Sequence, residues 1–152
     1  KRKEKPQIDL VVATTKQNLN IEFGLFRQNS NEEGSINKTA RTVKMLNDMI
    51  RLALDSYFTK RESYFICIAD KKMLGHQLRS NILGKFPSDY EINAEIIRRQ
   101  KEKKTSKFDE RFLSVFKDLD LTIKSRIVYN EKVEAKLINR ETRLIIWNIT
   151  ST

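Results

Sequence analysis

Cysteine and histidine are nearly absent from this chain, which excludes several kinds of site. Cys67 is the only cysteine and His76 the only histidine among 152 residues. One cysteine permits neither an internal disulfide nor a cysteine zinc site, and one histidine excludes a metal centre of several imidazoles. A Ser-His-Asp arrangement would have to use His76, and Leu74-Gly-His-Gln77 shows no nucleophile elbow. We expect Cys67 in the core and His76 on a helix surface.

Glycine and long apolar runs are also scarce. The chain has four glycines, and none belongs to a Gly-x-Gly-x-x-Gly or Gly-Lys-Ser/Thr loop, which argues against a cradle for nucleotide phosphates. No apolar stretch approaches the roughly 18 residues of a membrane span, and no signal-peptide segment is visible. The sequence therefore predicts no membrane partner and an intracellular location, cytoplasmic or nucleoid-associated.

Positive charge is what the chain has in excess. Thirty Lys and Arg residues face twenty Asp and Glu residues, giving a formal charge of +10, while 39% of the residues are hydrophobic. A folded, basic chain is expected to meet a polyanion, and we predict nucleic acid, DNA before RNA. A basic surface within a crowded complex is the alternative. A homodimer or a partner domain in a longer chain stays open, since the chain begins at Lys1 rather than Met.

The hydrophobic pattern predicts one α/β domain over residues 1–152, with a central mixed sheet and flanking helices. Residues 8–13 and 19–26 are expected to form a hairpin, and residues 35–58 the longest helix. Residues 64–69 form an unbroken apolar run, typical of a central strand covered on both faces.

The second half of the chain is predicted in less detail. A short helix is expected over residues 72–83, and another from Ser88, because Ser88-Asp-Tyr-Glu91 has capping-box spacing. Residues 98–107 are a basic loop or helix end. Residues 108–152 are expected to form a helix followed by antiparallel strands over 121–129, 133–137 and 142–149.

Two acids within the predicted hairpin stand among apolar residues. If a two-residue turn centres on Lys16 and Gln17, Asp9 faces Gly24 and Val11 faces Glu22. Side chains alternate at period two, so Asp9 and Glu22 would then share one face of the sheet and could hold a divalent cation. A turn of three or five residues would place them on opposite faces. As alternatives, Asp9 could bond backbone amides, and Glu22 could be a surface residue paired with Lys or Arg.

Pro6-Gln-Ile-Asp9 and Ile21-Glu-Phe-Gly24 resemble the two sequence motifs of the PD-(D/E)XK nuclease superfamily. The resemblance covers the order of elements over about residues 6–83, and it implies a restriction-endonuclease-like fold. It also implies hydrolysis of DNA phosphodiester bonds with Mg²⁺, or Mn²⁺, held by Asp9 and Glu22.

Gly24 stands where this family has its lysine. That lysine activates water or neutralises the phosphate, work that glycine cannot do. Candidate substitutes are Arg27, Gln28 and Lys38, and we favour Lys38 at the start of the long helix as the third catalytic residue.

Basic side chains are the predicted nucleic-acid contacts, because they can bind phosphates. They are Arg27, Lys38, Arg41, Lys44, Arg51, Arg98 and Arg99. Two functions remain open on the sequence: a metal-dependent DNA endonuclease, or a non-catalytic nucleic-acid-binding or assembly domain in which Gly24 marks a decayed nuclease.

Overall fold

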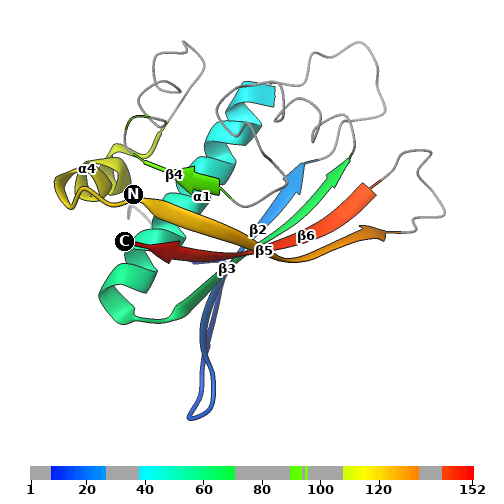
Figure 1. Ribbon diagram of the computed structural model, residues 1–152, viewed down its shortest axis with the longest axis horizontal. Helices are drawn as coiled ribbons and strands as arrows, with labels where there is room; N and C mark the ends of the chain where they lie inside the picture. Colours follow the sequence, from blue (N-terminus) through cyan, green and yellow to red (C-terminus); the bar gives the residue numbers. More distant parts are fainter. Residues whose placement is uncertain (1–7, 27–37, 71–89, 94, 96–107, 134–141) are drawn as a thin grey trace, which may run out of the picture.

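The structure is a computed structural model that describes residues 8–26, 38–70, 90–93, 95, 108–133 and 142–152. The elements within these ranges are β1 (Leu10–Ala13), β2 (Asn18–Phe26), α1 (Lys38–Thr59), β3 (Glu62–Asp70), β4 (Tyr90–Ile92), α4 (Glu110–Asp118), β5 (Ile123–Val133) and β6 (Thr142–Ser151). Their strands form one sheet in the order β1-β2-β3-β6-β5-β4. This confirms the predicted α/β class, with a mixed central sheet and helices beside it (Figure 1).

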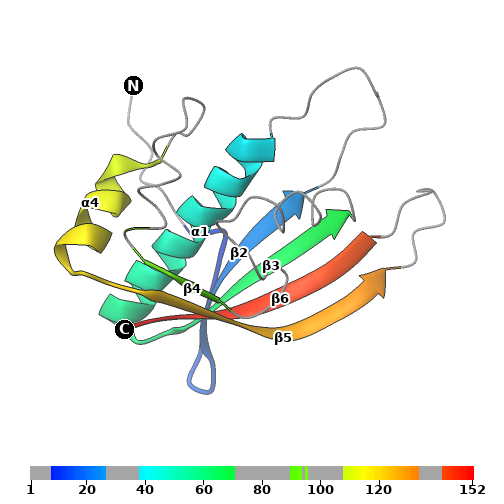
Figure 2. The same cartoon turned by 45° about the horizontal axis from the view of Figure 1, so that its top comes forward.

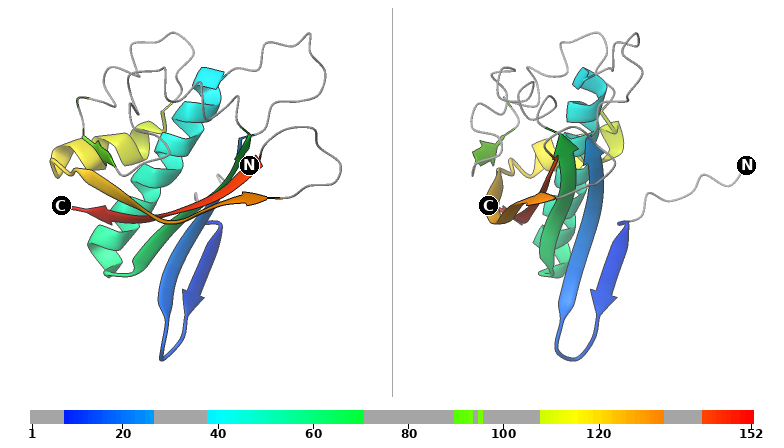
Figure 3. Two further views of the ribbon diagram at one scale, coloured as in Figure 1. Left: turned by 45° about the vertical axis from the view of Figure 1, so that its right-hand side comes forward. Right: turned by 90° about the vertical axis from the view of Figure 1, so that its right-hand side faces the viewer.

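The first three strands and α1 give the sheet its mixed character. β1 and β2 pair antiparallel, and their connecting turn projects beyond the other strands (Figure 3). α1 then carries the chain back, so that β3 pairs parallel to β2, as a helical crossover requires. β6 inserts antiparallel between β3 and β5, so β3 is central, as predicted.

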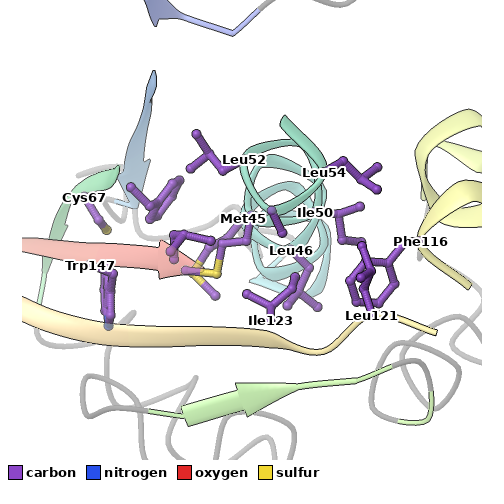
Figure 4. Close-up of a cluster of buried hydrophobic side chains, with 14 of the residues drawn as sticks. Met45, Leu46, Ile50, Leu52, Leu54, Cys67, Phe116, Leu121, Ile123 and Trp147 are labelled. Carbon is purple, nitrogen blue, oxygen red and sulfur yellow. The ribbon is translucent and has the colours of Figure 1, made fainter. Parts of the chain in front are cut away.

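The hydrophobic core lies between α1 and one face of the sheet. α1 packs against β2, β3 and β6 and contacts α4 (Figure 2). Met45, Leu46 and Ile50 from α1 are fully buried, together with Trp147 from β6 (Figure 4). Burying such side chains contributes roughly 1.5–3 kcal/mol each, and this packing fixes where α1 sits over β2.

The other face of the sheet is covered by none of the described helices, which corrects the prediction for β3. Phe65 and Cys67 point into the core and are buried, but Ile68 points the other way and is 38% exposed. Phe23 and Leu25 of β2 lie on the same side and are 47% and 59% exposed. The apolar run of β3 therefore reflects a central position in the sheet and one covered face.

Two further predictions about the second half were wrong. Tyr90–Ile92 is a strand, not the first turn of a helix from Ser88, because these residues pair with Ile123–Ser125 of β5. The edge pairing overrides the local capping signal. β5 is also one continuous strand to Val133, with a bulge between Ile127 and Tyr129. The predicted helix over 72–83, the basic segment 98–107 and the strand beyond Val133 lie outside the described residues.

Candidate functional site

The hairpin brings the two predicted acids close together, with Asp9 one residue before the start of β1. Val11 pairs with Asn20, two positions before the expected Glu22, and Leu10 pairs with Ile21. Continuing this ladder by one residue places Asp9 opposite Glu22 and not Gly24. The prediction of one shared face holds, because the turn has four residues, Thr14 to Gln17, and an even number preserves parity.

Asp9 and Glu22 differ strongly in their surroundings. Asp9 is exposed, and its Oδ2 accepts a hydrogen bond from the Phe23 N–H at 2.9 Å. Glu22 is completely buried on the face that α1 covers, with Asn20 and Gly24 to either side. Neither Glu22 carboxylate oxygen accepts a hydrogen bond from the described atoms. A buried charge with so little solvation is costly unless a cation compensates it.

α1 supplies the cation nearest to Glu22. Arg51 Nη2 lies 2.9 Å from Glu22 Oε1 and 2.5 Å from Asp48 Oδ1. Asp48 also pairs with Lys44, one helical turn earlier, at 2.7 Å between Nζ and Oδ2. Residues 44, 48 and 51 are four and three positions apart, so they lie on one face of α1. α1 packs against β2. The site is thus three carboxylates and two cations from the hairpin and α1.

Burial and neighbouring charges shift the pKa values of the three acids in different directions. Burial raises the pKa of Glu22 to about 8, and the neighbouring Asp9, which favours a proton held between the two carboxyls, adds to the rise. For Asp9, burial is outweighed by the Phe23 hydrogen bond, the Glu22 proton and the charges of Lys44 and Arg51, so its pKa is lowered. Burial also raises the pKa of Asp48, which Lys44 and Arg51 offset only in part. One proton at neutral pH therefore balances the site's charges.

Two neighbouring carboxyls are the oxygen groups that Asp9 and Glu22 could offer to a cation. Within the described residues, no group of three or more His, Cys, Asp or Glu side chains is arranged to hold a metal ion. Mg²⁺ is commonly bound by one or two carboxylates together with waters and substrate phosphates. Glu22 offers two buried oxygens without hydrogen-bond donors, which is the donor type that Mg²⁺ prefers.

The predicted third catalytic residue, Lys38, is the first residue of α1, but its side chain lies outside the described residues, so its part in the site stays a prediction. Arg51 was predicted as a nucleic-acid contact and not as a partner of Glu22, because only the packing of α1 on β2 shows which turn of the helix faces Glu22.

The predicted nucleic-acid contacts are only partly described. Lys44 is 62% exposed, but Arg51 is 20% exposed and turned inward to the two acids. Arg27, Arg98 and Arg99 lie outside the described residues, as do the side chains of Lys38 and Arg41. For these five residues, binding to nucleic acid stays a prediction.

Among the described residues, two cavities lined in part by α1 bear on the site and its surroundings. One, of about 260 Å³, lies beside the acidic site and is lined by Asn47, Asp48, Arg51, Phe108, Asp109 and Phe112. The other, of about 460 Å³, lies at the end of α1, where Lys60, Arg61 and Arg126 outnumber the one acid, Glu62. No local sequence pattern joins these three cations, because they come from separate parts of the chain.

No helix in the described part is long and apolar enough to cross a membrane.

Three kinds of comparison with known proteins found no relative of this chain. No family model matches the sequence, and no curated protein or solved structure resembles it significantly.

Proposed function

We propose that this protein is a metal-dependent nuclease that hydrolyses phosphodiester bonds in DNA. One observation carries the proposal: the carboxyls of Asp9 and Glu22 are neighbours, and the buried Glu22 oxygens accept no hydrogen bond from the described atoms. A buried carboxylate of this kind lowers the stability of the fold, and sites that keep such residues are often functional.

Asp9 and Glu22 are the residues that would bind the cation. Bound Mg²⁺ would polarise the phosphate and lower the pKa of an attacking water. Glu22 must give up its proton to bind, and the loaded site then carries one net positive charge from the three acids, two side-chain cations and the metal. That charge favours an incoming phosphate, as does the chain's formal charge of +10.

Arg51 replaces Lys38 in this proposal as the side chain that neutralises the phosphate. It is the cation that contacts Glu22, and a guanidinium offers five N–H donors that suit phosphate oxygens. Gly24 leaves its strand position without a side chain, and Arg51 approaches from the helix that packs on this face.

Cleavage of supercoiled and linear DNA with Mg²⁺ or Mn²⁺ tests the proposal. We expect cutting by the wild type, and a fall to the level seen with EDTA in Glu22→Gln and Asp9→Asn. Glu131→Gln, which changes an exposed strand carboxylate, is the matched control and should cut normally. Equal cutting by Glu22→Gln would refute the role of the pair.

A second candidate, a non-catalytic nucleic-acid-binding domain, is favoured by the same Arg51 contact. Because Arg51 lies between Glu22 and Asp48, the acids are already neutralised from within. In that case the wild type would bind DNA without cutting it under any metal, and divalent cations would not raise its melting temperature.

A further inference from the structure

The Arg51 contact with the acids has the geometry of a replaceable counter-ion. One nitrogen, Nη2, serves both Glu22 and Asp48, whereas strong arginine–carboxylate pairs use two parallel N–H donors on one carboxylate. Arg51 Nε is buried and makes no hydrogen bond with the described atoms. The guanidinium therefore holds Glu22 by charge and not by a fixed two-pronged hydrogen-bond geometry.

A cavity beside Arg51 could accept the guanidinium if it left Glu22. Asp48 and Arg51 line the 260 Å³ cavity together with Asp109, the N-cap residue of α4. Asp109 and Arg51 already attract one another electrostatically. A rotation of the Arg51 side chain away from Glu22 would carry the guanidinium into this cavity and nearer to Asp109, whose carboxylate already pairs with Arg111 at 2.6 Å.

A cation bound by Asp9 and Glu22 would conflict with the present position of Arg51. Nη2 stands 2.9 Å from Glu22 Oε1, within the space where a metal ion and its waters would bind. Two positive groups on one buried carboxylate repel strongly, because few water molecules screen them. While the guanidinium keeps this position it occupies Glu22 Oε1, and its charge weakens metal binding at the remaining oxygen, Oε2.

We propose that Arg51 is a built-in competitor for the metal site: it holds Glu22 when no metal is bound, and a divalent cation displaces it into the cavity between Asp48 and Asp109. This inference rests on the proposed role of Asp9 and Glu22 as metal ligands. The competition raises the metal concentration at which the site fills, because the metal must first displace Arg51. The displaced guanidinium is then able to contact a phosphate.

Mn²⁺ binding tests the competition without any need for activity. Electron paramagnetic resonance reports free Mn²⁺ directly, and we would titrate wild type, Arg51→Met and Lys44→Met. Lys44 is the matched control, because it too pairs with Asp48 and acts on Asp9 by charge, but no contact joins it to Glu22. We expect Arg51→Met to bind Mn²⁺ at least about tenfold more tightly, and Lys44→Met less than about threefold more tightly.

Each outcome of the titration is informative. Equal gains in the two variants would mean a general charge effect and would overturn the competition, as would an unchanged affinity in Arg51→Met. If neither wild type nor Arg51→Met binds Mn²⁺, the proposed metal site itself fails, which is a separate result. Binding by Arg51→Met alone would support strong competition. Arg51→Gln, checked by circular dichroism, serves if Arg51→Met does not fold.

Discussion

Asn20 and Glu22 occupy neighbouring inward positions of β2, and they meet α1 in opposite ways. Both are completely buried and both face the helix. Asn20 donates a hydrogen bond from Nδ2 to Asp55, one turn beyond Arg51, and the pair carries a single charge. Glu22 meets Arg51 with no hydrogen bond to either carboxylate oxygen from the described atoms. The Asn20 contact joins the strand to the helix by a hydrogen bond. The Arg51 contact leaves the Glu22 carboxyl buried and balanced only by charge.

This difference separates a structural contact from a candidate functional one. A buried amide that hydrogen-bonds to a carboxylate stabilises the packing of strand on helix. A buried carboxylate with a raised pKa destabilises the protein when it ionises, so a protein without use for it would gain by losing it. Four predictions test this contrast, from the largest expected effect to the smallest.

Metal affinity should depend steeply on pH, because Glu22 must lose its proton to bind a cation. The pKa of Glu22 is raised to about 8 by burial and by Asp9. Affinity for Mn²⁺ should therefore rise by about tenfold per pH unit from pH 6 towards 8 and level off above that value. Calorimetric titration across this range measures it. A flat profile would show that Glu22 is not the titrating ligand.

Glu22→Gln should stabilise the metal-free protein at high pH. The unfolded carboxyl ionises near pH 4.5 and the folded one near 8, so the folded state holds the extra proton between these values. Wild-type stability therefore falls as pH rises from about 4.5 to 8, and the glutamine variant escapes this loss. We expect it to exceed wild type by about 1–4 kcal/mol at pH 9 and by less at pH 6.

Urea denaturation at pH 6 and pH 9 measures this difference, with Glu131→Gln as the exposed control. An advantage that does not grow with pH would contradict the raised pKa as its cause.

Asn20→Ala should do the reverse and destabilise the protein. It leaves Asp55 without its strand partner and removes buried packing, at an expected cost of about 1–3 kcal/mol. The cost should be nearly the same at pH 6 and pH 9, and metal affinity should stay unchanged. A double-mutant cycle with Asp55→Ala isolates the pair. A coupling energy near zero would show that the two side chains do not stabilise one another.

Asp109→Ala should produce the smallest change. Asp109 caps α4 by accepting the Arg111 N–H at 3.2 Å, and loss of such a cap costs about 1 kcal/mol. Asp109→Asn keeps the cap but removes the charge that would receive the displaced Arg51. Thermal melts should therefore separate the two variants, and weaker Mn²⁺ binding should be common to both. Normal Mn²⁺ affinity in Asp109→Asn would deny Asp109 a part in the displacement.

Much of the fold could be predicted, because its signals are local. Apolar spacing over residues 35–58 predicted α1, and alternation and polar turns predicted the first hairpin and the hairpin-like pairing of β5 with β6. The strand at Tyr90–Ile92 could not be predicted in this way. Its backbone hydrogen bonds go to β5, more than thirty residues later, and no local pattern encodes that partner.

In the candidate site, too, local features could be predicted from the sequence and long-range contacts could not. From the sequence alone, Asp9 and Glu22 were expected to share a face only if the turn between their strands had an even number of residues. Only the tertiary structure decided the length of the turn and the register of the hairpin, that Glu22 is buried while Asp9 is exposed, and that Arg51 lies against Glu22. The physical reason is that alternation along a strand is a property of the chain itself. The turn of α1 that lies over β2 is instead set by how the whole core packs.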